Sequence, residues 1–207
     1  MPLEPDLSPA RHLPAPMPAA DWQRQLPVLT GRRAILRPLQ PTDATALLTM
    51  VGSAEVGRFI SPPPTTLDGF RRFIDWSAAE QREGRHVCYG VVPRRGHTTV
   101  GLFQVRSLES GFGVAEWGFA LGSAFWGTGL FLEAAQLVLG FTFDVLGTFR
   151  LEARAAVENG RGNGALRKLG AVEEGVLRRS FLRCGRYHDQ MLWVLLSDER
   201  TPPLRLR

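Results

Sequence analysis

The chain has 207 residues, of which 44% are hydrophobic and 22% charged. This composition is typical of a globular protein and excludes a disordered or collagenous one, and the length predicts one large core plus a tail. No apolar run approaches the roughly 18 residues of a membrane span. The first residues lack the pattern of a secretion signal. We therefore expect a cytoplasmic protein that does not enter a membrane.

The net charge is +5, from 25 basic and 20 acidic residues, and the isoelectric point is about 10.2. Such a balance suits an anionic ligand or a nucleic acid. The arginines stand singly or in pairs, without the block of like charges that marks a nucleic-acid-binding tail, so a small polyanionic ligand is favoured and nucleic acid is not. Cys88 and Cys184 are too few for a disulfide framework, and neither they nor the four histidines have metal-ligand spacing, so no metal is expected.

Prolines recur through the first twenty residues and prevent regular structure there, so residues 1–27 are predicted to form an extended Pro/Ala-rich arm. Trp22, Leu26 and Val28 are the first residues able to anchor it. The arm could pack on a second subunit and give a homodimer. Residues 28–198 are predicted to be the folded domain, and residues 199–207 a C-terminal tail.

Hydrophobic periodicity predicts alternating strands and helices in the domain. In chain order, the elements are a strand at 33–38, helices at about 42–51 and 65–84, strands at 86–91, 99–105 and 114–121, a helix at 130–145, a strand at 150–156, a short helix at 164–169, and strands at 172–182 and 187–196. Thr42 and Asp43 could cap the first helix, and Thr65 with Asp68 resembles a capping box for the second. The pattern predicts a mixed α/β fold with an antiparallel start and one central strand-turn-helix-strand unit.

The segment SAFWGTGLFLE, residues 123–133, is predicted to turn from a strand into a long helix. Gly127 and Gly129 let main-chain N–H groups point inward, and a helix N-terminus adds unpaired N–H groups and a positive dipole end, so the turn suits a phosphate or pyrophosphate. A plain tight turn is the alternative interpretation. No Lys-Ser/Thr follows the second glycine, and the spacing is too short for a dinucleotide fingerprint, so a kinase, NTPase or dehydrogenase is not favoured.

Four segments stand in this order along the chain: LTGRRAILRPLQPTDA, AEWGFALGSAFWGTGLFLEA, VENGRGNGALRKLGAVEEGVLR and GRYHDQMLWVLL. Together they resemble the GNAT N-acetyltransferases, specifically the RimJ/RimL-type branch. The resemblance implies a central mixed, mostly antiparallel twisted sheet of about six to seven strands, splayed in the middle and flanked by about four helices. It also implies acetyl-CoA as cosubstrate, with its pantetheine arm inserted between the strands at 114–121 and 150–156.

The resemblance further implies that main-chain groups hold the coenzyme. Phe119, Ala120 and Leu121 would bond the pantetheine amides, and an N–H near Phe119 would hold the oxyanion, where one donor is worth about 10²- to 10³-fold in rate. The complete implied coenzyme set is Phe119, Ala120, Leu121, Trp126, Gly127, Thr128, Gly129, Leu130, Asn159 and Asn163. The implied catalytic set is Glu116, Phe119 and Asn159.

The acceptor must be an uncharged amine, because an ammonium has no lone pair with which to attack a thioester. Glu116 is the best candidate to take the proton, since the two-residue strand period places it on the same side as Gly118 and Ala120. The alternative is a solvent-facing or salt-bridged strand glutamate. An aromatic set could wall the acceptor cleft, although core packing is the simpler interpretation for most of it: Phe59, Phe70, Phe73, Trp76 and Trp117.

Two positions depart from the family pattern. Gly162 stands where the family has a serine, and Ala124 where the wider superfamily has Gln or Arg. The leaving thiolate could then be protonated by water or by Tyr187, or catalysis could be weak. No nucleophile dyad is visible, so we predict direct transfer to a primary amine, on a peptide N-terminus or a small molecule, within a ternary complex. The alternative is a catalytically weak acyl-CoA-binding or protein-interaction module on the same fold.

Overall fold

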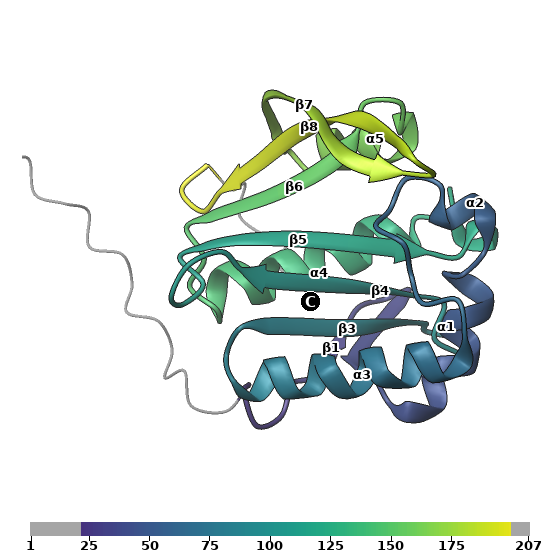
Figure 1. Ribbon diagram of the computed structural model, residues 1–207. Helices are drawn as coiled ribbons and strands as arrows, with labels where there is room; N and C mark the ends of the chain where they lie inside the picture. The colour runs from purple at the N-terminus through teal and green to yellow at the C-terminus, as the bar shows by residue number, and fades with distance from the viewer. Residues whose placement is uncertain (1–21, 200–207) are drawn as a thin grey trace, which may run out of the picture.

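A computed structural model of the chain describes residues 22–199 (Figure 1). One sheet holds eight strands in the order β1-β2-β3-β4-β5-β6-β8-β7. The strands are β1 (Leu29–Thr30), β2 (Ala34–Pro38), β3 (His86–Pro93), β4 (Gly101–Ser107), β5 (Val114–Leu121), β6 (Arg150–Ala156), β7 (Val172–Arg183) and β8 (Arg186–Leu196). The helices are α1 (Ala44–Met50), α2 (Ala54–Gly57), α3 (Leu67–Arg82), α4 (Leu130–Asp144) and α5 (Gly160–Lys168). The predicted mixed, mostly antiparallel sheet is confirmed.

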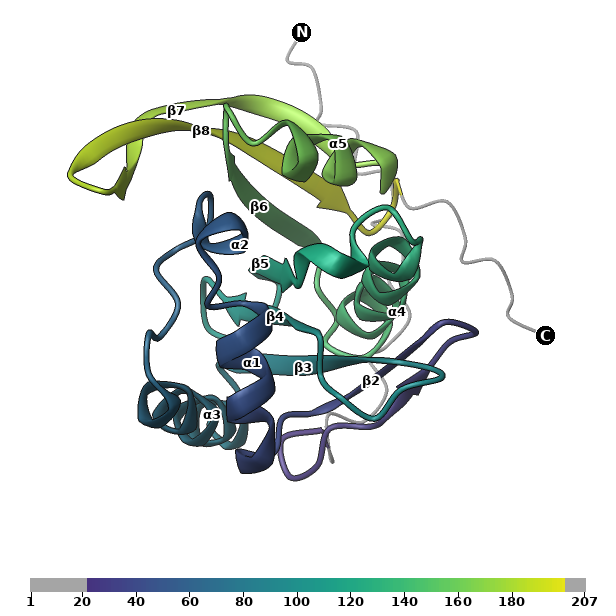
Figure 2. The ribbon, with the colours of Figure 1, turned by 90° about the vertical axis from the view of Figure 1, so that its right-hand side faces the viewer.

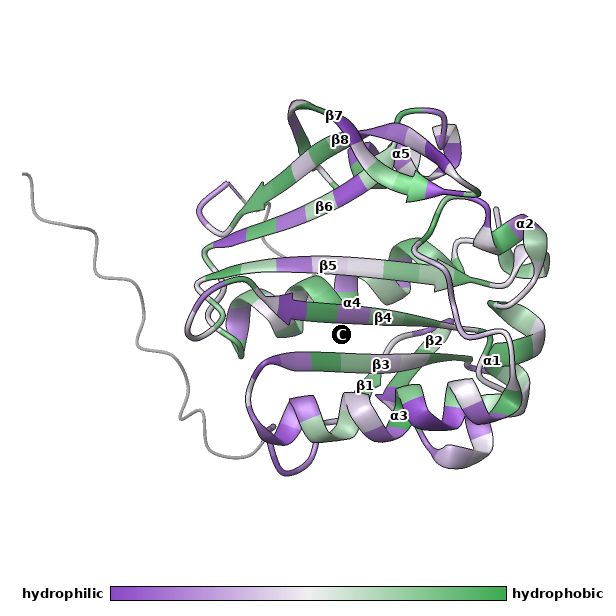
Figure 3. Cartoon of the chain, viewed as in Figure 1, coloured by the Kyte–Doolittle hydropathy of each residue, from purple (hydrophilic) through white to green (hydrophobic). Residues whose placement is uncertain are grey.

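Helices cover both faces of the sheet. Helices α1 and α3 lie on one face and α4 on the other, as the view along the sheet shows (Figure 2). The α4 side packs the larger core around Phe103 and Trp117, and the α1/α3 side packs a second cluster around Leu47 and Phe70. Hydrophobic residues accordingly concentrate in the central strands, while α3 carries hydrophilic residues on its outer side (Figure 3). Within residues 22–199, no helix combines the length and the apolar character that a membrane crossing needs.

Helix caps set the element boundaries, and they differ in detail from the predicted ones. Helix α3 is capped by Thr66, whose hydroxyl accepts from the Gly69 N–H at 3.0 Å, so Thr65 is not the cap. Asp43 precedes α1 without capping it. Its carboxylate instead accepts from the Gln40 N–H at 2.8 Å, which caps the 3-10 turn Pro41–Asp43 ahead of α1, and pairs with Arg37 at 2.7 Å. The short helix α2, which we did not predict, is capped by Ser53.

The packed domain begins before residue 28. Trp22 and Leu26 are buried, and the Trp22 ring packs edge-on against Phe112 at 5.6 Å between centroids, whereas Val28 is exposed and does not anchor the chain. The rest of the predicted arm, residues 1–21, and most of the predicted tail, residues 200–207, lie outside the described residues.

The sheet splits between β5 and β6, its one parallel pair. The register runs only through Val114–Arg150, Ala115–Leu151 and Glu116–Glu152, after which the strands diverge (Figure 1). On the other side of β5, the Gly122 N–H donates to the Val100 carbonyl. Antiparallel alternation from that bond directs the main-chain groups of residues 116, 118 and 120 toward β4, and those of residues 117, 119 and 121 into the split. An unpaired strand edge therefore lies in the middle of the sheet.

Candidate active site

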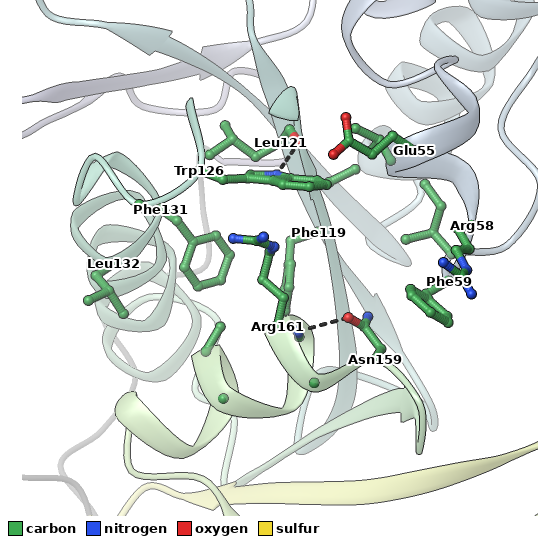
Figure 4. Close-up of a pocket in the computed structure, with 18 of the residues that line it drawn as sticks. Glu55, Arg58, Phe59, Phe119, Leu121, Trp126, Phe131, Leu132, Asn159 and Arg161 are labelled. Carbon is green, nitrogen blue, oxygen red and sulfur yellow. Dashed lines mark hydrogen bonds between the residues drawn. The ribbon is translucent and has the colours of Figure 1, made fainter. Parts of the chain in front are cut away.

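A cavity of about 700 Å³ opens at the split, between the end of β5, the turn after it, α2 and the start of α5 (Figure 4). The cavity brings together most of the sequence-predicted coenzyme residues, namely Phe119, Ala120, Leu121, Trp126, Gly127, Gly129 and Asn159. Thr128, Leu130 and Asn163 are not among its lining residues. The Leu130 side chain is instead buried in the core.

The glycine turn presents free main-chain donors to this cavity. Gly127 and Gly129 have φ values of +75° and +82°, a left-handed conformation that suits glycine, and Gly129 caps the 15-residue helix α4. Some N–H groups of the turn are already used: that of Trp126 donates to the Ser123 carbonyl and that of Leu130 to the Thr128 hydroxyl. Within residues 22–199, no acceptor binds the N–H groups of residues 127, 128, 129, 131 and 132. Such a set at a helix N-terminus can hold an anion.

Trp126 fixes the turn to the strand. Its indole N–H donates to the Leu121 carbonyl at 2.8 Å, and the Arg161 guanidinium lies over its ring at 4.3 Å (Figure 4). Arg161 and Lys168 of α5 both line the cavity and add positive charge beside the free N–H groups. The sequence analysis did not single out these two basic residues. Their position on the short helix after Asn159, a predicted coenzyme residue, could have indicated that they lie near the coenzyme site.

A second cavity, of about 530 Å³, continues from the first on the α1/α3 side of β5. The predicted aromatic set borders it, although Phe70 and Trp117 are buried in the two cores: Phe59, Phe70, Phe73, Trp76 and Trp117. The two cavities share the lining residues Phe59, Ile60, Phe119, Ala120, Asn159 and Gly162. A ligand in each cavity would therefore meet the other at the end of β5, beside the unpaired main chain of Phe119.

Glu116 lies in the lining of the second cavity, with 19% of its side chain exposed. Its carboxylate bonds Arg106 through one oxygen and Arg154 through the other, the latter at 3.1 Å. The Glu116–Arg154 pair crosses the split between β5 and β6, and Arg154 also pairs with Glu152 on its own strand. Glu116 thus combines both sequence-based interpretations, because it is salt-bridged and also borders a cavity.

Asn159 and Gly162 form the junction between the cavities. The Asn159 Oδ1 accepts from the Gly162 N–H at 2.9 Å and caps α5, which therefore begins at Gly160 rather than at residue 164. A Cβ built on Gly162 would lie 2.5 Å from the Asn159 Nδ2, so the carboxamide fills the space of a side chain at position 162.

Asn163 has a structural place. Its amide donates to the Ala156 carbonyl at 3.0 Å and to the Val157 carbonyl at 3.3 Å, and its Oδ1 accepts from the Trp193 indole at 2.9 Å. These bonds use the polar atoms of a buried side chain to tie α5 to β6 and β8.

The remaining candidates for an acid, base or nucleophile lie away from the junction or are unreactive. Tyr187 is 64% exposed and lines neither cavity, which makes it a poor acid for a thiolate formed there. Burial raises the pKa of the Cys88 thiol to about 12, and Cys184 is exposed. Burial also lowers the pKa of His86, which lines the second cavity and lies within bonding distance of Ser77 and Gln104. The part of the chain that the structure describes has no cluster of metal-ligating side chains.

A mixed sheet that splits at its one parallel pair, beside a glycine turn and an elongated cavity, defines a GNAT-type acyltransferase fold. The chain belongs to this family, because the profile of the acetyltransferase (GNAT) domain matches residues 33–172. The predicted family and fold are thus confirmed, and the protein is an N-acetyltransferase by family.

Several relatives agree with this membership. The chain is 27% identical to N-acetyltransferase p20 of Bacillus licheniformis, an uncharacterised protein, over 83% of this chain and 97% of that one. It is 25% identical to the provisionally named ribosomal N-acetyltransferase YdaF of Bacillus subtilis, over 79% and 91%, and 26% identical to the spermidine N(1)-acetyltransferase of Escherichia coli, over 81% and 90%. The crystal structure of a provisionally assigned acetyltransferase from T. thermophilus superposes with a TM-score of 0.70 at 30% identity, over 83% and 90%.

Proposed function

We propose that the protein transfers acetyl from acetyl-CoA directly to a primary amine in a ternary complex. The observation that carries this proposal is the meeting of two cavities at Phe119 and Asn159, since direct transfer needs two ligands in contact at one point. Membership of the GNAT family supports acetyl-CoA as the donor. The cytoplasmic location expected from the sequence remains a prediction.

The first cavity would hold the coenzyme. The pantetheine arm would pair with the open edge of β5, where the main-chain groups of Phe119 and the N–H of Leu121 face the split; the Leu121 carbonyl is already bound by Trp126. Ala120 would contribute surface rather than hydrogen bonds, because its main chain faces β4. The pyrophosphate would bind the free N–H groups of residues 127–129, with Arg161 beside them.

The transfer step would take place where the cavities meet. The Phe119 N–H would stabilise the oxyanion, and Glu116 would accept the proton of the attacking amine, directly or through a water. An α-amine, with a pKa near 7.7 to 8.0, needs less help from such a base than a lysine amine near 10.4. With Gly162 in the position of the family serine, the thiolate would be bonded by the Asn159 amide and protonated by water.

The acceptor would be a peptide N-terminus or a small amine, in line with the names of YdaF and the spermidine acetyltransferase. A second function has its own support. Gly162 offers no hydroxyl acid, and Glu116 is ion-paired through both oxygens, so a catalytically weak acyl-CoA-binding module is the alternative.

Calorimetric titration with acetyl-CoA, with dephospho-CoA and ATP as controls, combined with Glu116→Gln, tests the proposal. We expect micromolar binding of acetyl-CoA by both forms and a loss of transfer of about 10²- to 10⁴-fold in the variant. Glu173→Gln, an exposed site on β7, is the matched control and should leave both quantities unchanged. An enzyme without affinity for acetyl-CoA contradicts the proposal, and equal transfer by Glu116→Gln and the native protein removes Glu116 from it.

A further inference from the structure

The second cavity carries a net positive charge. Among the described residues, its lining includes the basic residues Arg106 and Arg154 and a single acidic residue, Glu116. His86, the remaining titratable group of the lining, is buried and uncharged at neutral pH, because burial lowers its pKa. Two positive charges therefore face one negative charge.

The single carboxylate is already fully engaged, whereas the guanidinium groups are not. Glu116 uses one oxygen for Arg106 and the other for Arg154. A guanidinium has five N–H donors. Arg106 donates from Nη2 alone, and Arg154 donates from Nη1 to Glu116 and weakly, at 3.4 Å, from Nη2 to Glu152. No further partner of either group occurs within residues 22–199, so both have donors left for an anionic ligand.

This balance is unsuited to a polyamine. A polycation would need carboxylates for its second and third ammonium groups, and it would meet two arginines instead. The lining also includes the aromatic side chains of Phe59, Phe73 and Trp76, which suit an apolar body. The spermidine acetyltransferase among the relatives is thus a poor guide to the acceptor of this chain.

We propose, on the basis of the function proposed above, that the acceptor is an amine that also carries a carboxylate and an apolar side chain. The carboxylate binds the free N–H donors of Arg106 and Arg154, the apolar part packs against the aromatic residues of the lining, and the amine reaches the junction at Phe119. The amine adds to the thioester carbonyl, which forms the C–N bond and an oxyanion, and the C–S bond breaks as this intermediate collapses to the amide. The amine proton passes to Glu116 and then to water, and water protonates the departing thiolate.

A free amino acid and a peptide with an acidic second residue offer the same chemistry, so the assay includes both. Release of the coenzyme thiol is measured with phenylalanine, phenylalaninamide and spermidine, and with the C-terminally amidated dipeptide pair Ala-Glu-amide and Ala-Gln-amide, of which only the first carries a carboxylate. We expect the carboxylate-bearing member of at least one pair to have a kcat/KM about tenfold or more above its neutral partner and above spermidine. The preferred pair identifies the source of the carboxylate.

Arg154→Gln tests the assignment to the arginines, with Arg95→Gln, an exposed site in the turn after β3, as a control of equal charge change. We expect Arg154→Gln to reduce the ratio of kcat/KM for the acid over its amide by about 10- to 100-fold, mainly through KM, and the control to leave the ratio unchanged. Because Arg154 also bonds Glu116, only this ratio is diagnostic.

The possible failures are distinguishable. Affinity for acetyl-CoA together with a preference for spermidine or for the amides, or with no transfer to any carboxylate-bearing amine, overturns the inference and leaves the acetyl-CoA site in place. The absence of both acetyl-CoA affinity and transfer to every amine overturns the proposed function itself.

Discussion

Restoring the family serine at position 162 should destabilise this protein. In Gly162→Ser, the new Cβ would come within 2.5 Å of the Asn159 Nδ2 and 2.9 Å of its Cγ, closer than side chains approach each other, so the carboxamide has to turn away. That movement breaks the bond from the Gly162 N–H to the Asn159 Oδ1, which caps α5. Loss of a helix cap costs about 1 kcal/mol, within a range of roughly 0.5 to 2.

Gly164→Ser provides the matched control, because it places the same side chain in the same helix with no atom within 4 Å of its Cβ. Replacement of a helical glycine by serine gains roughly a few tenths of a kcal/mol, and this gain is common to both variants. The difference between them therefore isolates the conflict with Asn159. We expect Gly162→Ser to be about 1 kcal/mol less stable than Gly164→Ser, which corresponds to roughly 2 to 4 °C in Tm.

Thermal and urea unfolding of the two variants measure this difference directly. A Gly162→Ser protein that is as stable as Gly164→Ser, or more stable, would refute the reasoning, because it would mean that Asn159 does not hold this position. Acetyl transfer gives a second readout. Since the serine displaces Asn159 from the cavity junction, we expect lower transfer; several-fold faster transfer would show instead that a missing hydroxyl limits the rate.

Two further predictions concern Asp43 and Trp126. Asp43→Asn should lower the free energy of unfolding by about 2 to 3 kcal/mol, because it leaves the largely buried Arg37 unpaired. Burial alone would raise the pKa of Asp43, but hydrogen bonds from Arg37, the Gln40 N–H and Thr99 outweigh it and hold the pKa below the ordinary 3.8. The Asp43 carboxyl therefore binds a proton more readily in the unfolded chain than in the folded one. Its contribution to the free energy of unfolding is present above about pH 4 and is lost as the pH falls further. If urea unfolding gave the same stability difference between native protein and variant at pH 7 and at pH 3, this reasoning would be contradicted. Trp126→Phe keeps a ring for Arg161 but removes the donor to the Leu121 carbonyl. We expect the free energy of unfolding to fall by about 1 kcal/mol and calorimetry to show several-fold weaker binding of acetyl-CoA. An unchanged dissociation constant would exclude a role of this hydrogen bond in shaping the site.

Local signals predicted the fold well where they are strong. The two-residue period of the strands and the glycine turn before α4 are set by residues close together in the chain, so they can be predicted from the sequence, and the structure confirms them. The exact caps were less accessible: Thr65 and Thr66 are both able to cap α3, and only the bond to the Gly69 N–H decides between them. Asp43 resembles a cap in sequence, and its carboxylate does accept from the Gln40 N–H ahead of α1, but its long-range bond from Thr99 could not be predicted.

Within the candidate site, the sequence located the main-chain elements better than the side chains. The turn with Gly127 and Gly129 lines the first cavity as expected. The ion pairs of Glu116 could not be predicted, because Arg106 and Arg154 come from the strands on either side and their register is a tertiary property. Asn163 matched a family position, yet the indole of Trp193, distant in sequence, gives its side chain a structural place.

The divergence of β5 from β6 also bears on how this protein avoids aggregation. An unpaired strand edge commonly invites a strand of another chain to add to it. Here the open edge is internal: β6 pairs with β5 up to Glu116, and the Trp126 indole covers the Leu121 carbonyl at the other end. A foreign strand would have to enter a wedge closed at its apex, whereas a thin extended molecule can slide in from the wide end. The shape of the split therefore leaves the unpaired main-chain groups of β5 accessible to a ligand but not to a strand of another protein.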